Sequence, residues 1–339
     1  MKLTIGVKAL NEERHIAMAL ASAVRAAEPF GGEVVLADSG STDKTLEIAS
    51  TLPVRIVQLA DPSERSCGAG AQLAFQEADG DYFYLLDGDM VLDPDFLPAA
   101  IAHMEAHPDL AAVGGLVREM NVDGHDFQIR AMAVKNDKNW RPGLVDRLDC
   151  GGLYRVSAVR EVGHFADRNL HAFEEFELAA RLTARGWRLA RIDHPAVDHY
   201  GHQTEGYRML WRRMKSGYAG AAGEVLRGAL GRPHLPLVLR RLAHIRNGLA
   251  VMAWWTMLIA CLISPLPLAI RAATFAVLVL TPIALLSWRR GSLSLGLYSL
   301  AAWNIGALGL ITGFLRRRTP PARALDALNL APVTARTDD

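Results

Sequence analysis

The sequence predicts an α/β protein built on a mostly parallel sheet, followed by a group of membrane-spanning helices. Short apolar runs alternate with helical patterns up to about residue 120, and acidic residues stand where several of these runs end. A third observation is a region almost without charge from Asn247 to Leu315. The 339 residues suffice for one catalytic domain and a substantial appendage.

The first part of the chain has the pattern of repeated βα units. Runs rich in β-branched and aromatic residues predict strands at LTIGV, EVVLA, VRIVQL, DYFYLL and LAAVGGLV. Apolar residues near the 3.6-residue period predict helices over residues 12–26, 43–51, 66–78, 95–106 and 173–186. The polar residues 121–150 predict a long loop or insertion beside the open edge of the site.

Composition excludes several classes of partner. Lys and Arg number 37 against 36 Asp and Glu, so the net charge of +1 gives no global field that would attract nucleic acid. Cys67, Cys150 and Cys261 show neither a disulfide framework nor a zinc-binding spacing, which fits a reducing cytoplasm. The N-terminal apolar stretch is too short for a signal peptide and is interpreted as a first strand.

After residue 200 the chain changes character. Residues 206–230 place apolar side chains on one stripe, which indicates either a helix on a membrane surface or an ordinary packed helix. The region with little charge is long enough for three spans, at residues 248–268, 270–288 and 292–315. We expect a catalytic domain, an amphipathic segment, two to four membrane helices with three preferred, and a flexible tail, at 1–205, 206–246, 247–316 and 317–339.

The positions of the basic residues conflict with three crossings of the membrane. The positive-inside rule places Arg240 to Arg246 and Arg289-Arg290 in the cytoplasm, with a hairpin between them. A third crossing would then place Arg316 to Arg318 outside. Either the last segment re-enters the membrane or another segment lies at its surface, and Pro265 and Pro267 favour a break in the first segment. A buried soluble helical bundle is the alternative to a membrane region.

An acidic pair follows the apolar run YFYLL. Asp87 and Asp89 are two residues apart, so the period of a strand would send both carboxylates to one side. Hard oxygen ligands select Mg²⁺ or Mn²⁺, which typically lie between protein carboxylates and substrate phosphates. The same spacing is common in turns and helix caps, so a metal site needs further residues to support it.

Two other segments reach the same edge of the sheet. A strand ends at Asp38, Gly40 permits a tight turn, and Asn11-Glu12 follows the first strand. Open α/β sheets bind ligands at the carboxyl ends of their strands, where Asp38 can accept hydrogen bonds from a base or a ribose hydroxyl. The alternative is a strand–turn–helix connector in which these residues are helix caps.

Four segments, in this order, resemble the family 2 glycosyltransferases of GT-A fold: VKALNEE, ADSGSTDKT, ADGDYFYLLDGDM and FEEFELAARLTARGWR. The resemblance covers about residues 2–200. It implies a Rossmann-like mixed sheet, a nucleotide-diphosphate sugar as donor, an inverting displacement at the anomeric carbon, and Mg²⁺ or Mn²⁺ as cofactor.

The resemblance also implies roles for individual residues. Those expected at the nucleotide sugar are Asn11, Glu12, Asp38, Gly40 and Asp87. The expected metal ligands are Asp87, Asp89 and His199, with His202 as the alternative histidine. Glu175 stands at the position of the catalytic base, with Glu174 beside it.

The sequence departs from the family pattern in three places. Lys8-Ala9-Leu10 lacks the usual proline, Gly70-Ala71-Gln72 stands where Ala-Arg-Asn is common, and Glu175 is longer by a methylene than the usual aspartate. Glu177 and Arg181 match the family pattern, but their i, i+4 spacing is typical of an ion pair that stabilises a helix.

Together these features predict transfer of a sugar to a lipid-linked acceptor, either a polyprenyl phosphate or a lipid-linked glycan. The expected location is the cytoplasmic face of the inner membrane, with membrane lipid as a partner, in envelope or exopolysaccharide synthesis. The chain lacks the Gln-x-x-Arg-Trp motif of processive polysaccharide synthases. Such a synthase and a non-enzymatic membrane scaffold are the alternatives, and the sugar, nucleotide and acceptor stay open.

Overall fold

The computed structural model of the chain describes residues 2–120, 134, 137–201 and 206–330. The described residues form two compact units. One, which we call the sheet unit, holds the residues up to 201 together with residues 318–330. The other, the helical unit, holds residues 206–317.

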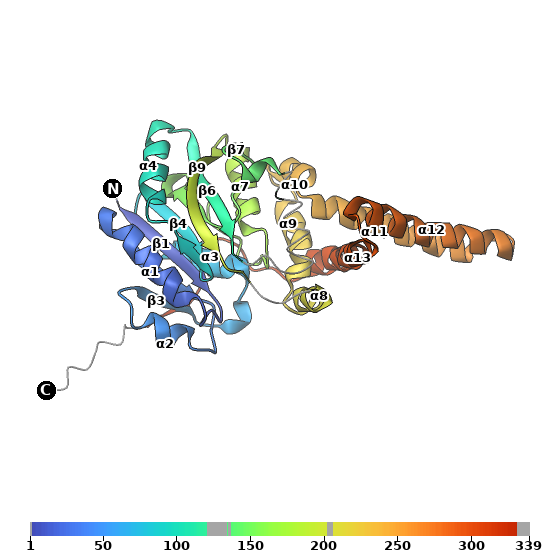
Figure 1. Cartoon of the computed structure of the whole chain (residues 1–339), viewed down its shortest axis with the longest axis horizontal. Helices are drawn as coiled ribbons and strands as arrows, with labels where there is room; N and C mark the ends of the chain where they lie inside the picture. Colours follow the sequence, from blue (N-terminus) through green and yellow to red (C-terminus); the bar gives the residue numbers. More distant parts are fainter. Residues whose placement is uncertain (1, 121–133, 135–136, 202–205, 331–339) are drawn as a thin grey trace. The chain divides into compact units, whose positions relative to one another are not determined.

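The sheet unit contains a mixed sheet with the strand order β10-β3-β2-β1-β4-β8-β6-β9-β5, and β7 also pairs with β9 (Figure 1). Strands β3, β2, β1 and β4 are parallel, whereas β8 is antiparallel to both of its neighbours. The strands are β1 (Leu3–Ala9), β2 (Glu33–Asp38), β3 (Arg55–Leu59), β4 (Tyr82–Asp87), β5 (Met90–Leu92), β6 (Leu110–Glu119), β7 (Gly143–Val145), β8 (Gly152–Arg155), β9 (Arg188–His199) and β10 (Ala327–Leu330).

Helices follow the strands, five of them where the sequence predicts helices, whereas α6 was not predicted. They are α1 (Ile16–Ala27), α2 (Thr45–Ala49), α3 (Cys67–Gln76), α4 (Phe96–Ala106), α6 (Val156–Glu161) and α7 (Glu174–Ala184). The expected α/β architecture with a mixed sheet is therefore confirmed. Half of the loop predicted over residues 121–150 lies outside the described residues, and the other half contains β7, which pairs with β9.

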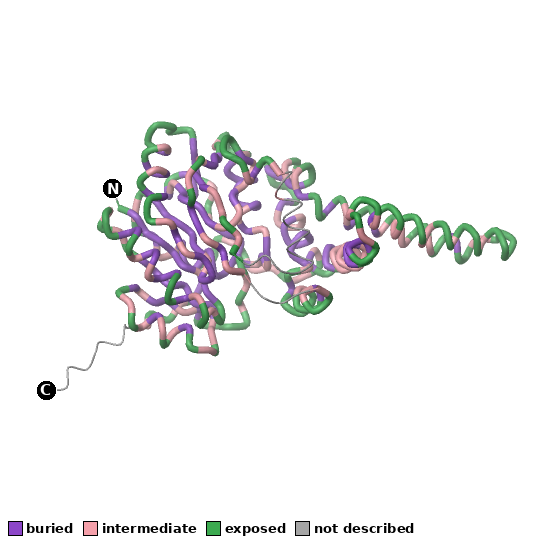
Figure 2. The backbone as a smooth tube through the Cα atoms, in the orientation of Figure 1, coloured by how far each residue is buried: buried purple, intermediate pink, exposed green. Residues whose placement is uncertain are grey.

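Both faces of the sheet are buried, which is why its strands read as continuous apolar runs. In β2, Val34 and Leu36 belong to one core layer, whereas Val35 and Ala37 belong to the other. Figure 2 shows the central strands as buried along most of their length. With both faces covered, the carboxyl ends of β1, β2 and β4 form the edge that is available to a ligand.

The last described residues of the chain return to this sheet. Residues 318–330, which we call the return segment, end in β10, and β10 pairs antiparallel with β3. Gln76 exchanges two hydrogen bonds with the backbone of Leu325, at 3.2 and 2.8 Å. The prediction of a flexible tail over residues 317–339 is therefore wrong for residues 318–330, because a strand that pairs with distant residues leaves no local signal. Residues 331–339 lie outside the described residues.

The helical unit consists of α8 (Gly206–Lys215), the 3-10 helix η4 (Tyr218–Gly220), α9 (Ala221–Ala229), α10 (Leu235–Arg241), α11 (Ala243–Ile263), α12 (Leu268–Arg290) and α13 (Leu293–Leu315). The single helix expected over residues 206–230 is broken at Gly217, whose φ is 83°. By length and composition, α11, α12 and α13 can each cross a membrane, with mean hydropathies of 1.4, 2.0 and 1.4.

Candidate active site

Asp38, the last residue of β2, has one carboxylate oxygen without a hydrogen-bond partner, at the edge of the sheet that is available to a ligand. Its Oδ2 accepts hydrogen bonds from the backbone N–H groups of Gly40 and Ser41 and from Nε2 of Gln58, each at 2.9 Å. Its Oδ1 is buried and has no hydrogen-bond partner in the structure. Buried polar atoms are rarely left unpaired in folded proteins, so this oxygen is a candidate contact for a donor group of a ligand.

Asn11 and Glu12 shape the loop around Asp38. Asn11 Oδ1 accepts a hydrogen bond from the N–H of Thr42 at 2.8 Å, and the Asn11 N–H donates to Ser41 Oγ at 2.8 Å. The N–H of Glu12 donates to Thr45 Oγ1 at 2.8 Å. In the structure, these predicted nucleotide residues brace the turn that begins at Gly40, whose φ is 89°.

The acidic pair lies where β4 turns into β5. Asp87 ends β4, and Asp89 lies in the turn, so one strand does not direct both carboxylates and that part of the reasoning is wrong. Because β5 pairs with β9, with Met90 opposite His199, the imidazole lies beside Asp89. The distance between His199 Nε2 and Asp89 Oδ2 is 3.5 Å. His202 lies outside the described residues.

Asp89 and His199 fit a shared cation. Neighbouring ligand atoms of an octahedral ion bound at about 2.1 Å lie roughly 3 Å apart, close to the observed separation. Glu119, which the sequence analysis did not single out, accepts at Oε2 from the other ring nitrogen of His199 at 2.8 Å. A carboxylate in that position orients a ligating histidine and fixes its tautomer.

Without a bound cation, the imidazole of His199 retains its proton. Burial by itself lowers the pKa of His199, but hydrogen bonds to Asp89 and Glu119 outweigh burial and raise it to about 9. Burial also raises the pKa of Asp87, although the charge of Lys8 opposes that shift. Metal binding here must therefore displace the imidazole proton, so metal affinity should increase with pH.

Lys8 is part of the site, although the sequence analysis named it only because the segment Lys8-Ala9-Leu10 lacks the proline that is usual in the family. Its Nζ lies 3.2 Å from Asp87 Oδ1 and 2.6 Å from Glu174 Oε1. Burial lowers the pKa of Lys8, but these two carboxylates outweigh burial and hold the pKa well above its ordinary value. Lys8 is thus a fixed cation between the acidic pair and the start of α7. No local pattern identifies it, because both partners are distant in sequence.

Glu174 and Glu175 have different surroundings at the start of α7. Glu174 is held in the ion pair with Lys8. Glu175 Oε1 accepts hydrogen bonds from the N–H of Gly151 at 3.2 Å and from the hydroxyl of Tyr154 at 3.3 Å. Burial raises the pKa of Glu175 to about 8, with Lys8 acting in the opposite direction. A carboxylate with a raised pKa is suited to proton transfer, which favours Glu175 over Glu174 as a base.

Among the described residues, three other than glycine have a left-handed backbone, and each stands next to a site residue. Asn11 (φ 58°) precedes Glu12, Cys150 (φ 68°) precedes Gly151, and Phe173 (φ 66°) precedes Glu174. Such conformations cost roughly 1–3 kcal/mol and persist where the surrounding structure holds them. Their concentration at one edge of the sheet is a second indication of a functional site.

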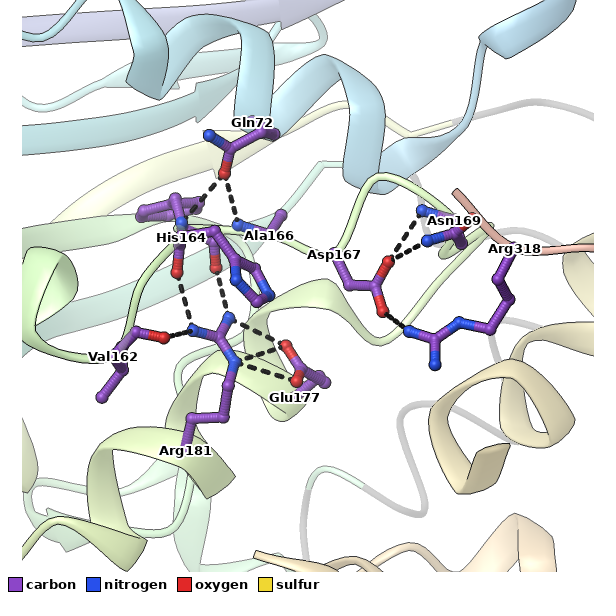
Figure 3. Close-up of polar contacts among 10 residues, drawn as sticks. Gln72, Val162, His164, Ala166, Asp167, Asn169, Glu177, Arg181 and Arg318 are labelled. Atoms are coloured by element: carbon purple, nitrogen blue, oxygen red, sulfur yellow. Dashed lines mark hydrogen bonds and ion pairs between the residues drawn. The ribbon is translucent and has the colours of Figure 1, made fainter. Parts of the chain in front are cut away.

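The loop that leads into α7 is pinned by a buried polar network (Figure 3). Arg181 pairs with Glu177 and also donates to the carbonyls of Val162, His164 and Phe165. Gln72 Oε1 accepts from the N–H groups of Phe165 and Ala166 at 2.9 and 3.1 Å. Glu177 and Arg181 therefore do more than stabilise their helix, because they also hold the loop that precedes Glu175 in the sequence.

The fold and the arrangement of these residues are typical of the GT-A class of glycosyltransferases. The mixed sheet presents a buried aspartate at the end of β2 and an acidic pair where β4 ends, and a glutamate stands at the start of α7. The fold is similar to that of the mannosyltransferase PcManGT from Pyrobaculum calidifontis, with 22% identity, a TM-score of 0.58 and coverage of 90% of this chain and 86% of that one. It is also similar to TarS 1–349 of S. aureus, with 16% identity, a TM-score of 0.52 and coverage of 93% and 89%.

Residues 4–163 match the family model described as Glycosyl transferase family 2, and this part of the chain belongs to that family. Among curated relatives, the succinoglycan biosynthesis protein ExoA of Rhizobium meliloti is 27% identical over 212 residues, which cover 58% of this chain and 62% of that protein. The dolichol-phosphate mannosyltransferase of Pyrococcus furiosus is 24% identical over 131 residues, covering 38% and 37%. The chain thus spans less than two thirds of these relatives.

Proposed function

We propose that the chain transfers a sugar from a nucleotide-diphosphate sugar to a lipid-linked acceptor, with inversion and with Mg²⁺ or Mn²⁺ as cofactor. The acceptor is a polyprenyl phosphate or a lipid-linked glycan at the cytoplasmic face of the inner membrane. The product serves envelope or exopolysaccharide synthesis. One observation carries this proposal: the orphaned Oδ1 of Asp38, the Asp89–His199 pair and Glu175 all lie at the end of the sheet where its strands terminate.

The comparisons support the parts of this proposal to different degrees. The structure of PcManGT was solved with GDP-Man and Mn²⁺, which supports a nucleotide-sugar donor and a divalent metal. Similarity to a succinoglycan biosynthesis protein and to a dolichol-phosphate mannosyltransferase supports a glycan or lipid acceptor. Three helices of sufficient length and hydropathy support the membrane location.

Each residue of the site has its own role in this proposal. Asp38 accepts a hydrogen bond from the base or ribose, while Asp89 and His199 would hold the metal, with Asp87 beside them. The bound metal supplies charge stabilisation for the departing diphosphate. Glu175 Oε1 takes the proton of a sugar hydroxyl as it attacks the anomeric carbon. An acceptor phosphate is already anionic and needs no base.

A donor screen tests this proposal. Membranes that contain the chain are incubated with UDP-, GDP- and dTDP-sugars and a lipid extract, with Mg²⁺, Mn²⁺ or a chelator. One donor is expected to show metal-dependent nucleotide release together with transfer of radiolabel into the lipid fraction. Absence of both, with no metal-dependent binding of any nucleoside diphosphate, would instead support a scaffold.

Asp38→Asn is expected to weaken donor binding about 10–100-fold with little change in kcat. The substitution places a donor where the base or ribose requires an acceptor, and an unpaired buried polar group costs about 1–3 kcal/mol. The measurement is the Kd of the nucleoside diphosphate and the KM of the donor. Asp43→Asn is the matched control, because Asp43 lies on the same loop and accepts from the N–H of Thr45 at 3.0 Å. Equal effects of the two substitutions would contradict the assignment.

Lys8→Met is expected to strengthen Mn²⁺ binding about tenfold and to slow transfer. Loss of a positive charge beside Asp87 removes repulsion toward the cation, since charges a few ångström apart interact by a few kcal/mol near a protein surface. Transfer slows because Glu174 loses the partner that holds the start of α7. Manganese titration and kcat measure the two effects. Lys8→Arg keeps the charge and should resemble the unaltered protein, whereas weaker Mn²⁺ binding by Lys8→Met would contradict this role.

A further inference from the structure

The helical unit is inserted in the sequence between two parts of the sheet unit. Residues up to 201 and residues 318–330 belong to the same unit, and β10 pairs directly with β3. A hydrogen-bonded sheet of this kind lies on one side of a membrane, since hydrocarbon cannot satisfy its loops and edges. Residues 206–317 must therefore leave and return on the same side. This requires an even number of crossings, although three helices have the length of spans.

Two of these helices form a hairpin. A short turn at residues 264–267 connects α11 to α12, and Trp254 Nε1 donates to the carbonyl of Leu278 at 2.9 Å. Because these two residues are about equally far from the turn, α11 and α12 run antiparallel. In the most apolar part of α12, 0% of the residues are buried, which is the pattern of a helix that faces lipid (Figure 2).

The third helix contacts one end of that hairpin. A Cβ atom on Gly296 would collide with Ser287 near the end of α12, and one on Gly248 near the start of α11 would lie 2.9 Å from Leu310. Gly248 and Ser287 are at similar depth in the hairpin, within about one helical turn. Residues 296 to 310 extend over about 21 Å of helix. Helix α13 therefore crosses the α11–α12 pair near this end and reaches as far as Trp255, whose Nε1 donates to Asn304 Oδ1 at 2.8 Å, while most of α12 stays exposed (Figure 1).

Charged residues of α9 lie against the C-terminal end of α13. Arg227 on α9 donates to the carbonyls of Phe314 and Arg316 at 2.7 and 3.1 Å, and the buried Glu224 pairs with Arg316. The backbone of η4 also lies against α13, where a Cβ on Gly313 would collide with Gly220. Charged side chains are costly in hydrocarbon, so this half of α13 belongs at the membrane surface.

We propose that, among the described residues, only α11 and α12 cross the membrane, and that α13 lies in the surface of the bilayer. The exposed face of α13, with Leu308, Ile311 and Leu315, then contacts the boundary between headgroups and acyl chains. The inference rests on the membrane location given under the proposed function. Apart from Arg271, which stands near the turn between α11 and α12, the basic residues of the helical unit then lie on one side, so the conflict between Arg316 to Arg318 and the positive-inside rule disappears.

Single cysteines test the number of crossings in the full-length protein. The three native cysteines are replaced with serine, and Ser264→Cys, Ser292→Cys or Arg317→Cys is added. Sealed vesicles of known orientation are treated with a membrane-impermeant maleimide. Ser264→Cys, in the turn between α11 and α12, is expected to react from one side, and the other two from the opposite side. Reaction of Ser292→Cys and Arg317→Cys from different sides would show a third crossing and overturn the proposal.

Spin labels test the depth of α13 directly. Leu280 on α12 and Leu308 on α13 form a matched pair, because both are exposed leucines away from the ends of their helices. A nitroxide at Leu280 should be accessible to oxygen and protected from a water-soluble relaxant, and one at Leu308 should be shallow. Equal depth would overturn the surface assignment. A shallow label at Leu280 would overturn the membrane location itself, and neither result depends on sugar transfer.

Discussion

Asp89→Asn is expected to abolish measurable Mn²⁺ binding and to lower kcat about 10³-fold, a loss typical of removing one stabilising group from a developing charge. Asp89 is buried and lies 3.5 Å from His199, so its carboxylate is the anionic half of the proposed two-residue cation site. Asparagine keeps the shape of the side chain and removes its charge. Manganese titration by electron paramagnetic resonance and steady-state kinetics are the measurements.

Asp93→Asn is the control for this experiment. Asp93 follows β5 within the same segment, and its side chain accepts from the N–H of Asp95 at 3.0 Å. The control should bind Mn²⁺ and turn over the donor like the unaltered protein. If Asp89→Asn binds Mn²⁺ as tightly as this control does, the metal lies elsewhere or the reaction uses none.

Glu175→Gln is expected to lower kcat about 10²–10⁴-fold with a sugar hydroxyl as acceptor, the range for loss of a general base. The base must be ionised, and burial raises the pKa of Glu175 to about 8. The rate of the unaltered protein should therefore rise with pH up to about 8 and then level off. Glu175→Gln should lose this dependence. The measurement is a pH–rate profile with saturating donor.

The charges around Glu175 determine the pH at which the rate rises. Lys8 lowers its pKa, whereas Asp149, Asp87 and Glu174 raise it. If the acceptor is a lipid phosphate, Glu175→Gln should transfer at nearly the rate of the unaltered protein. That outcome would remove the base assignment and identify the acceptor class at once.

Glu175 should also decrease stability at alkaline pH. An acid whose pKa is raised by folding releases its proton first in the unfolded state, so the free energy of unfolding falls as pH rises from about 4.5 to about 8. Glu175→Gln is therefore expected to raise Tm at pH 8 and to leave it nearly unchanged at pH 4. A lower Tm at pH 8 would show that the glutamine disrupts the site, which makes this measurement the control for the kinetic loss.

The sequence was sufficient to predict the α/β fold and the segments that carry the site. Both rest on local patterns: apolar runs form the strands, and acidic residues such as Asp38 stand directly at strand ends. Their carboxyl ends meet because parallel strands must share an edge, so Asp38 and Asp87 could be brought together without coordinates. Roles taken from the family resemblance, such as that of Glu175, stay predictions.

Features that depend on distant pairing could not be predicted from the sequence. Lys8 meets Glu174 across 166 residues, and Glu119 meets His199 across 80. The two carboxylates of the acidic pair were expected on one strand, but the strand ends at Asp87. The return segment was missed for the same reason, since β10 has only four residues and takes its stability from β3.

The return segment also determines how the catalytic domain can be isolated. Removal of everything after residue 317 would take away β10 and Leu325 and leave unpaired the N–H and C=O groups of β3 that face β10. Unpaired edges of this kind are sites of aggregation. Excision of residues 206–317, with a flexible linker from residue 201 to Arg318, would keep the edge strand on the sheet and the pair between Arg318 and Asp167. The apolar helices are therefore better removed from within the domain than cut from its end.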